Sequence, residues 1–407
     1  MRAIGLTSGI GSMLIGARAA GFTVLGNIEW RPYYHWQDDQ GRNTFTENFP
    51  GAFLVHKIDE LDEKQIRALR GKIDLAMGHP ECGSYSNLRP NKTAKLKDPG
   101  DIPLFCELVN RLKPRFFVQD NLPKSLIGWT IQQWKEALPD YDLFPEWISN
   151  YHYGNSQFFR RRFFMIGALK KEKFVFVPGE FEHITHLRHM LKGLPPKRDI
   201  KKINHVHVKD KDRLHGFSPH NFAETRDKEV VTLGDFKEVI RDYPSKRNFQ
   251  YYNKQGVQHF KPGYSKICLD NTCPVMTGGG SALDNHYRED TLNPLTMRER
   301  ARIQGCPDDF IFYPLDYLRD FKTYSAVYKQ IGKFMPVQFC TYVAELIAAH
   351  IAGKPVVETR EKLFNQRVIN PNPYIDEAKK WYCETHGYKP KARQKLICQT
   401  CWLPCKR

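Results

Sequence analysis

Short apolar runs in the first part of the chain alternate with segments in which apolar residues have helical spacing. The pattern predicts strands at residues 3–6, 23–28, 53–55, 72–77 and 115–118, and helices at 13–20, 63–69 and 103–112. Strands that alternate with helices in this way are typical of an α/β fold with a mostly parallel sheet.

The pattern changes from Lys170 onward. Residues 170–290 are basic and rich in His, Pro and Gly, with little regular spacing, which favours a recognition surface over a second catalytic core. Helical spacing returns at residues 295–305, which begin with a capping box from Thr296 to Glu299. A turn at Gly332 then precedes an apolar helix that is predicted to begin at Val337.

Length and charge narrow the class of protein. A chain of 407 residues is long enough for two domains and a small appendage. The 62 Lys and Arg outnumber the 45 Asp and Glu, so the formal charge is +17, and aromatic residues lie among the basic ones. This combination suits a polyanionic partner, most simply nucleic acid, although a generally basic soluble protein has the same balance.

The N-terminus and the cysteines indicate a soluble, intracellular protein. No signal peptide is visible after Met1, and no apolar run approaches the length of a membrane span. The 10 cysteines are scattered and do not form a disulfide framework, so most of them are expected to be reduced.

Cys82 is the strongest candidate for chemistry. It lies in the loop Gly78-His79-Pro80-Glu81-Cys82-Gly83-Ser84-Tyr85-Ser86-Asn87, which follows a buried strand, and α/β enzymes carry their functional groups at such strand ends. We predict a nucleophile, although most cysteines act only as small hydrophobic residues. Asp120 follows the next buried strand and is an acid or base candidate, or simply a turn former.

A glycine-rich turn, Ser8-Gly9-Ile10-Gly11, joins the first predicted strand to the first helix. Glycines there allow a ligand to approach the backbone closely, and Glu29, at the end of the second strand, is placed to bind both hydroxyls of a ribose. Trp30 is suited to stack on an adenine. The third glycine of the dinucleotide fingerprint is missing, which argues against NAD, and a turn of this kind also serves tight packing.

The order of these segments resembles that of the C5-cytosine DNA methyltransferase family over residues 1–167 and 290–351. The resemblance rests on six motifs: Ser8-Gly9-Ile10-Gly11 with Glu29-Trp30, Pro80-Glu81-Cys82, Asp120-Asn121-Leu122, Arg160 with Arg162, residues 295–305 with Pro307-Asp308, and Gln330-Ile331-Gly332 with Pro336-Val337. It implies a Rossmann-like methyltransferase sheet that uses S-adenosylmethionine. The implied domains are catalytic and cofactor-binding at 1–169, target-recognition at 170–290, a return to the catalytic domain at 291–355, and a tail at 356–407.

The family mechanism gives roles to the catalytic positions. A cytosine is flipped out of double-stranded DNA, and the Cys82 thiolate adds to its C6. Asp120 is expected to hydrogen-bond N3 and the exocyclic amine, while Arg160 and Arg162 hold O2 and a nearby phosphate. The base that removes the C5 proton is not assigned. Besides Ser8, Gly9, Ile10, Gly11, Glu29 and Trp30, the positions expected to contact the donor are Asp59, Leu104, Gly332 and Lys333.

Several residues depart from the family pattern around the reacting centre. Glu81 replaces a proline beside Cys82, and its carboxylate would raise the pKa of the thiol unless a cation offsets it. Asp120 is one methylene shorter than the usual Glu. Gln157 lies one residue too early relative to the two arginines. Thr7 and Lys57 replace an aromatic and an acid near the adenine, and Asp59 substitutes for that acid if the register shifts.

Lys333 stands where the family has Asn. An ammonium about 4 Å from a sulfonium would cost about 4 kcal/mol at an effective dielectric constant of about 20. A donor that carries a carboxylate would form an ion pair instead, so carboxy-S-adenosylmethionine, which would leave 5-carboxymethylcytosine, is an alternative donor. Lys333 otherwise extends to solvent or pairs with an acid such as Glu81.

The tail contains two pairs of metal-ligating residues. Cys383 and His386 form one pair, and Cys398 and Cys401 form another after eleven intervening residues. This spacing predicts a structural zinc, with Cys405 as a substitute ligand and chance clustering of cysteines as the alternative. The basic residues around these positions suggest that the tail also touches DNA.

Two further functions stay open. The changes at Glu81 and Asp120 are compatible with a catalytically silent DNA-binding homologue, and one branch of the resembled family methylates tRNA. We expect a monomeric, cytoplasmic protein of a bacterium or a phage-infected cell that acts on double-stranded DNA. The recognition sequence is not readable from residues 170–290.

Overall fold

The computed structural model describes residues 1–31, 37–38, 40–82, 85, 98–149, 153, 155, 157, 160–177, 187–194, 248–252, 258–262, 265–267, 276, 286–288, 295–315 and 321–355. Contacts between Cα atoms divide the chain into two compact units. The first consists of Met1–Gly154, Arg161–His183 and Phe334–Arg407, and the second of Asn155–Arg160 and Ile184–Lys333. The predicted domain limits at 169, 290 and 355 stay a prediction.

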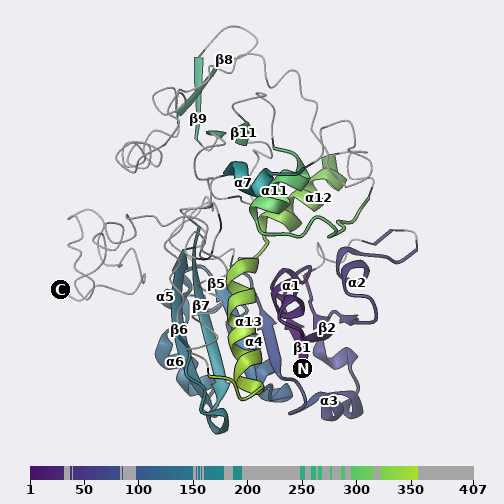
Figure 1. Cartoon of the computed structure of the whole chain (residues 1–407), viewed down its shortest axis with the longest axis vertical. Helices are drawn as coiled ribbons and strands as arrows, with labels where there is room; N and C mark the ends of the chain where they lie inside the picture. The colour runs from purple at the N-terminus through teal and green to yellow at the C-terminus, as the bar shows by residue number, and fades with distance from the viewer. Residues whose placement is uncertain are drawn as a thin grey trace, which may run out of the picture. The chain divides into compact units, whose positions relative to one another are not determined.

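The first unit is built on a seven-stranded sheet, which confirms the predicted α/β class (Figure 1). Its strands are β1 (Arg2–Leu6), β2 (Thr23–Ile28), β3 (Phe53–Val55), β4 (Leu75–Gly78), β5 (Phe116–Asn121), β6 (Tyr141–Ser149) and β7 (Arg161–Leu169). They lie in the order β3-β2-β1-β4-β5-β7-β6. The first five are parallel, and β7 runs antiparallel to both of its neighbours.

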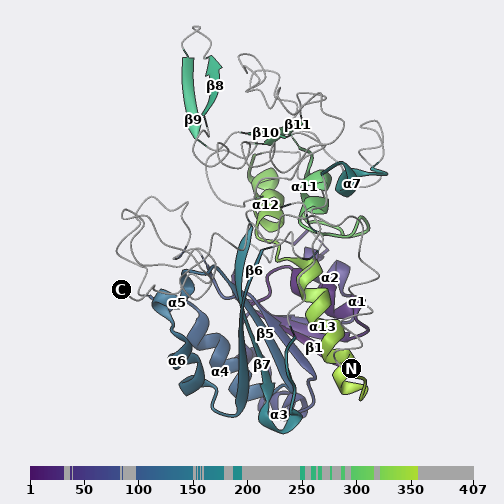
Figure 2. The ribbon, with the colours of Figure 1, turned by 60° about the vertical axis from the view of Figure 1, so that its left-hand side comes forward.

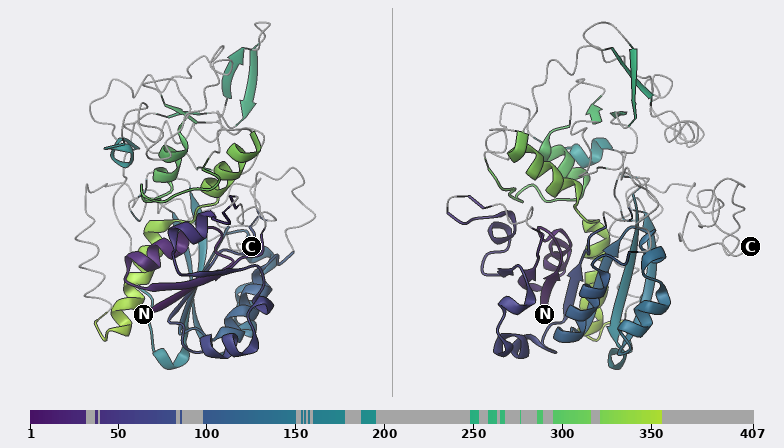
Figure 3. Two further views of the ribbon diagram at one scale, coloured as in Figure 1. Left: turned by 90° about the vertical axis from the view of Figure 1, so that its right-hand side faces the viewer. Right: turned by 180° about the vertical axis from the view of Figure 1, so that it is seen from behind.

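Helices cover both faces of this sheet. α1 (Ser12–Ala19) and α13 (Val337–Ile351) pack together on one face, and α4 (Ile102–Leu112), α5 (Ser125–Gly128) and α6 (Ile131–Ala137) lie on the other (Figures 2 and 3). The shorter elements are α2 (Thr44–Asn48), η2 (Ile58–Glu60), α3 (Glu63–Leu69) and η5 (Lys170–Glu172). Gly16 allows the close approach of α1 to α13, because a Cβ at this position would lie 2.6 Å from the Thr341 backbone nitrogen.

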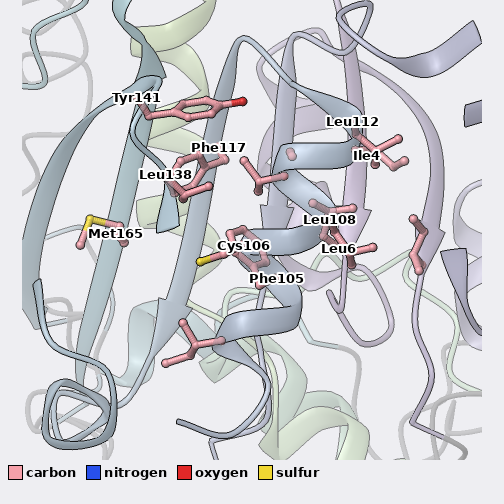
Figure 4. Close-up of a cluster of buried hydrophobic side chains, with 14 of the residues drawn as sticks. Ile4, Leu6, Phe105, Cys106, Leu108, Leu112, Phe117, Leu138, Tyr141 and Met165 are labelled. Carbon is pink, nitrogen blue, oxygen red and sulfur yellow. The ribbon is translucent and has the colours of Figure 1, made fainter. Parts of the chain in front are cut away.

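The main core fills the space between the sheet and α4 (Figure 4). Phe105 and Phe117 are fully buried there, and the Phe117 ring stacks on Trp134 at a centroid distance of 6.3 Å. Phe117 pairs across the sheet with Gly167, where a Cβ would lie 2.0 Å from the Phe117 ring. The glycine therefore makes room for a large aromatic residue in the neighbouring strand.

β5 is longer than predicted. The apolar run ends at Val118, yet the strand continues to Asn121, because Asp120 and Asn121 pair with Phe164 and Phe163 of β7. Asp120 consequently lies on a strand in the middle of the sheet, and not on a loop. Its position is fixed by the backbone hydrogen bonds of β7, which makes it a rigid support for other side chains.

The second unit contains α7 (Leu187–Leu191), β8 (Asn248–Tyr252), β9 (Gln258–Pro262), β10 (Ser265–Ile267), β11 (His286–Arg288), α11 (Met297–Ile303) and α12 (Phe321–Gly332). The predicted capping box at α11 is confirmed, since Thr296 and Glu299 satisfy each other's backbone N–H groups. Two arginines of α11 are buried. Arg298 donates to the carbonyls of Pro307 and Phe310, and Arg300 lies over the Tyr328 ring.

In the part of the chain that the structure describes, no single helix is long and apolar enough to span a membrane. Ser325–Gly332 and Val337–Ile351 meet the length and composition criteria only when taken together, as a bent pair.

Candidate active site at the carboxyl ends of the parallel strands

The sheet order places two functional loops side by side. β1 and β4 are neighbours, yet the chain leaves β1 toward β2 and β3 and leaves β4 toward β5, so the direction of winding reverses between them. Ligands of open α/β sheets bind at this switch point, outside the carboxyl ends of the strands. The glycine-rich turn follows β1 and the Cys82 loop follows β4, and His79 N donates to the Thr7 carbonyl at 3.1 Å.

The glycine-rich turn is held by Asn27 of β2. Gly9 and Gly11 have φ angles of 65° and 86°, in the left-handed region that favours glycine. Asn27 donates to the Gly9 carbonyl at 2.8 Å, and its amide oxygen lies 3.0 Å from the Ser8 hydroxyl. Asn27 was not predicted, and its only signal in the sequence is a polar residue inside an apolar strand.

Glu29 lies at the end of β2, as predicted, but its carboxylate is already engaged. Oε1 accepts from the backbone and Nε of Arg31 at 3.0 and 2.6 Å, while Oε2 accepts from Gly9 N at 2.6 Å and Arg31 Nη2 at 2.5 Å. Both side chains are buried. A carboxylate has about four acceptor positions, so ribose hydroxyls reach Glu29 only if Arg31 releases some of these bonds.

The other predicted donor contacts are scattered. Trp30 is half-buried at the end of the same strand. Asp59 lies in η2, is 79% exposed and pairs with Arg111 at 3.0 Å. Leu104 is a half-buried residue of α4 that packs on the main core. Gly332 and Lys333 belong to the second unit, where Lys333 N donates to the Lys329 carbonyl at 3.0 Å.

Cys82 is half-buried and lies beside His79, which was not predicted as a site residue. The His79 ring and the Cys82 sulfur share a hydrogen bond, and His79 is only 3% exposed. Its Nδ1 lies 2.9 Å from Asp120 Oδ2 and 3.1 Å from the Asp120 carbonyl. The signal that sequence analysis missed is a histidine three residues before the nucleophile in the same loop.

Asp120 and Arg162 form a buried ion pair behind this histidine. Arg162 Nε donates to Asp120 Oδ1 at 2.9 Å, and Nη2 donates to Oδ2. The same Nη2 lies 3.2 Å from His79 Nδ1 and 3.5 Å from the sulfur of Met335, and the guanidinium also hydrogen-bonds Cys82. The structure therefore brings three predicted residues, Cys82, Asp120 and Arg162, together around His79.

The charges of this cluster favour a thiolate. Burial by itself raises the pKa of the Cys82 thiol, but the charge and hydrogen bond of His79 and the charge of Arg162 lower that pKa to about 7. Burial also favours neutral His79, yet the charge of Cys82 and the hydrogen bond with Asp120 raise the pKa of the ring above its usual value. Burial disfavours the charge of Asp120, but Arg162 and His79 lower its pKa.

Glu81 has only a small effect on Cys82. Its charge is a minor cause that raises the pKa of the thiol, and His79 and Arg162 are the cations that offset it. The Glu81 carboxylate is 33% exposed and lies 4.0 Å from Arg31 Nη1, while its backbone N–H donates to Asp101. Arg31 thus faces both Glu29 and Glu81.

Arg160 is engaged elsewhere. It belongs to the second unit, where its Nη1 donates to Gln304 and, at 3.2 Å, to the Met276 carbonyl. Gln157 is also buried there and donates to Gln304 at 2.9 Å. Arg160 directly precedes β7, which begins at Arg161, and its predicted contact with the base stays a prediction.

The predicted zinc ligands Cys383, His386, Cys398 and Cys401 lie outside the described residues, so zinc stays a prediction. Within the described ranges, no group of three or more His, Cys, Asp or Glu side chains is arranged to hold a metal ion. The cysteines described besides Cys82 are Cys106, Cys306 and Cys340, all buried free thiols whose pKa is raised by burial.

Comparison with known proteins assigns this arrangement to a family. The family model of C-5 cytosine-specific DNA methylase matches residues 1–349. The chain belongs to this family. Type II methyltransferase M.FnuDI of Fusobacterium nucleatum is 23% identical over 384 residues, which cover 89% of this chain and 99% of that protein. Type II methyltransferase M.HgiDI of Herpetosiphon aurantiacus is 29% identical over 372 residues, covering 86% and 95%.

Solved structures show that this member of the family shares its fold with distant proteins. Entamoeba histolytica methyltransferase EhMeth has a TM-score of 0.53 at 14% identity, covering 87% of this chain and 98% of that one. A Spodoptera frugiperda DNMT2 mutant has a TM-score of 0.54 at 11% identity, covering 85% and 99%. At these identities the likeness concerns the fold alone. The family resemblance inferred from the six motifs is confirmed.

Proposed function

We propose that the chain transfers a one-carbon group to C5 of cytosine in double-stranded DNA, with Cys82 as the nucleophile. The observation that carries the proposal is the arrangement of Cys82 beside His79 and Arg162, where two cations lower the pKa of the thiol to about 7. A thiolate available near neutral pH is what addition to C6 requires.

The other residues act on the base. Arg162 is held rigidly by Asp120, so its guanidinium is fixed beside the sulfur to hold an oxygen of the flipped cytosine. Asp120 is ionised, because its pKa is lowered, and therefore accepts a hydrogen bond from the exocyclic amine. With Arg162 and His79 already bound, Asp120 Oδ1 keeps the position for that bond. Arg160 and Glu81 serve as supports, the first for Gln304 and the second for Arg31.

The residues at the β1–β4 switch point are of the chemical types that bind S-adenosylmethionine. They combine a glycine-rich turn, a buried carboxylate at the end of β2 and the half-buried Trp30. When bound, the donor supplies an electrophilic carbon on a sulfonium. Glu29 would hold the ribose hydroxyls after Arg31 releases some of its bonds, and the side chains of Ser8 and Asn27 keep the turn in place.

Family membership and the positive net charge of the chain both support a double-stranded DNA substrate. Both Type II relatives described above are named methyltransferases, and the formal charge of +17 favours a phosphate backbone. The altered Glu81 does not by itself indicate a silent homologue, because the structure provides cations that offset its effect on the thiol.

Covalent trapping tests the proposed function. A pool of duplexes in which 5-fluorocytosine replaces cytosine is mixed with the protein and S-adenosylmethionine. We expect a denaturation-resistant complex linked through Cys82, because fluorine at C5 cannot leave as a proton does and the adduct persists. The linked peptide is identified by mass spectrometry, and a matched RNA pool is the control. Trapping on RNA alone would contradict the DNA proposal, and trapping on neither would support a silent homologue.

Carboxymethyl transfer is the second candidate. The observation that favours it is Lys333, a half-buried cation in the position where the family has Asn. An ammonium at the donor repels a sulfonium and attracts a carboxylate. Carboxy-S-adenosylmethionine would then be the donor and 5-carboxymethylcytosine the product.

A competition between the two donors distinguishes these candidates. Purified protein is given equal amounts of S-adenosylmethionine and carboxy-S-adenosylmethionine with duplex DNA, and the modified nucleosides are identified by mass. If Lys333 selects the donor, the Lys333→Asn variant raises the ratio of 5-methylcytosine to 5-carboxymethylcytosine by at least about tenfold. This factor corresponds to about 1.4 kcal/mol of selectivity. An unchanged ratio, or no carboxymethyl product from the unaltered protein, would exclude the carboxymethyl candidate.

A further inference from the structure

His79 is a buried titratable side chain beside the nucleophile, and the proposed function gives it no proton-transfer step. It lies between two groups that mechanism needs, Cys82 and Asp120. We propose that His79 is the catalytic base that takes the proton of the Cys82 thiol, with Asp120 as the carboxylate that positions it. This inference rests on the proposed function, since it concerns the same nucleophile.

The geometry assigns a task to each ring nitrogen. Nδ1 lies 2.9 Å from Asp120 Oδ2 and 3.1 Å from the Asp120 carbonyl, both acceptors, and 3.2 Å from Arg162 Nη2. We assign the ring proton to Nδ1, which then donates a hydrogen bond to Asp120. With Nδ1 directed at Asp120, we assign the interaction with Cys82 to Nε2, the other ring nitrogen. A base oriented by a third group is the general arrangement for activating a nucleophile.

The surroundings stabilise the charged products of the proton transfer. When the S–H bond of Cys82 breaks, its electron pair stays on sulfur and its proton bonds to Nε2. The new imidazolium faces the Asp120 carboxylate, and the new thiolate faces the Arg162 guanidinium. Each new charge thus meets a fixed charge of opposite sign, and the cluster keeps the same net charge before and after the transfer.

The groups around His79 come from four elements. Its own loop contributes Cys82, β5 contributes Asp120 and β7 contributes Arg162. Among the described residues, α13 and the segment just before it contribute two neutral groups near Asp120 and Arg162: Cys340, whose pKa is raised by burial, and Met335. The raised pKa of His79 and the lowered pKa of Cys82 agree with an ion pair between them.

The role of the pair in catalysis follows from these charges. An electron pair of the Cys82 sulfur would form the S–C6 bond while the C5=C6 π pair moves to C5. C5 would then bond the donor's carbon as the carbon–sulfonium bond breaks and its electron pair goes to the donor sulfur. Once water has taken the C5 proton, the C5–H electron pair reforms the C5=C6 bond and the S–C6 pair returns to sulfur, beside an imidazolium that has kept its proton. His79 thus serves both addition and release of the nucleophile.

The pH profile of Cys82 alkylation tests this inference without DNA or donor. The whole chain is treated with iodoacetamide over a range of pH, and the tryptic peptide that carries Cys82 is followed by mass spectrometry. We expect a midpoint near pH 7 for the unaltered protein. In His79→Asn, whose amide still donates to Asp120, we expect the midpoint to rise by about 1.5 pH units toward the value of a free thiol, with about 30-fold less thiolate at low pH.

His56→Asn is the matched control, because this histidine is exposed and lies outside the Cys82 loop. Its midpoint should equal that of the unaltered protein. A midpoint near that of a free thiol in the unaltered protein, or an unchanged midpoint in a folded His79→Asn, would overturn the inference. A midpoint near that of a free thiol in the unaltered protein overturns the inference even if His79→Asn does not fold. Trapping by 5-fluorocytosine without the pH shift would leave the proposed function standing and remove His79 from it.

Discussion

A Cys82→Ala variant is expected to lose transfer to DNA by on the order of 10⁴-fold or more, because removal of a catalytic nucleophile removes the pathway itself. Without the sulfur, C6 has no partner, and C5 of cytosine does not become nucleophilic. The measurement is incorporation of a labelled one-carbon group from the donor into duplex DNA. The folded state should change little, since Cys82 is only half-buried and lies in a loop after β4.

Cys106→Ala provides the matched control for this prediction. Cys106 lies in α4 and packs in the main core, and burial raises the pKa of its thiol to about 12, so it is not a nucleophile near neutral pH. This variant should lose some stability but keep its turnover per folded molecule. If Cys82→Ala kept a hundredth of the original rate, or if Cys106→Ala lost as much as Cys82→Ala, the assignment of the nucleophile would be wrong.

Local patterns in the sequence were sufficient to predict the sheet and the position of Cys82. β1, β2, β3 and β4 are short apolar runs between Gly-rich or polar turns, and the parallel order follows from the helices between them. The strand before Cys82 was predicted at 72–77 and lies at Leu75–Gly78. Because carboxyl ends of parallel strands share one edge of the sheet, the glycine-rich turn and the Cys82 loop meet there.

The partners of the site residues were not predictable in the same way. The contact of His79 with Asp120 joins residues 41 positions apart, and that of Arg162 with Asp120 joins residues 42 positions apart. A sequence pattern shows that a strand has a buried face, but not which polar side chains from other strands meet it. The different hydrogen-bond partners of Arg160 and Arg162 were likewise not readable from their spacing, since Arg162 lies in β7 and Arg160 lies just before it.

The departures from the family pattern compensate one another in the structure. Asp120 is shorter than the usual Glu, and it is held from both sides by Arg162 and His79. Glu81 adds a negative charge beside the thiol, and Arg31 lies 4.0 Å from it. Each substitution that looks unfavourable in isolation is thus accompanied by a cation within reach.

An Arg162→Met variant is expected to lose about 3–5 kcal/mol of the free energy of unfolding at neutral pH, because it leaves a buried charge without its main partner. Asp120 is fully buried, and Arg162 supplies two of its hydrogen bonds. The loss should be measured by urea denaturation at pH 7. The loss should shrink as the pH falls, because Asp120 in the variant can then be protonated and the unpaired buried charge disappears. In the unaltered protein, the lowered pKa of Asp120 gives stability that is present above its unfolded pKa. That stability is lost as the pH falls through the folded pKa.

The double variant Asp120→Asn with Arg162→Met separates the ion pair from ordinary packing. It removes the buried charge as well as its partner while keeping nearly the same volume, so it should recover a large part of the stability that Arg162→Met loses. Its stability should also depend less on pH than that of the single variant. Two results would show that the ion pair is solvated or easily replaced: a double variant no more stable than Arg162→Met, or a single variant that loses less than about 1 kcal/mol. In either case Asp120 would not be the rigid support on which His79 and Arg162 depend.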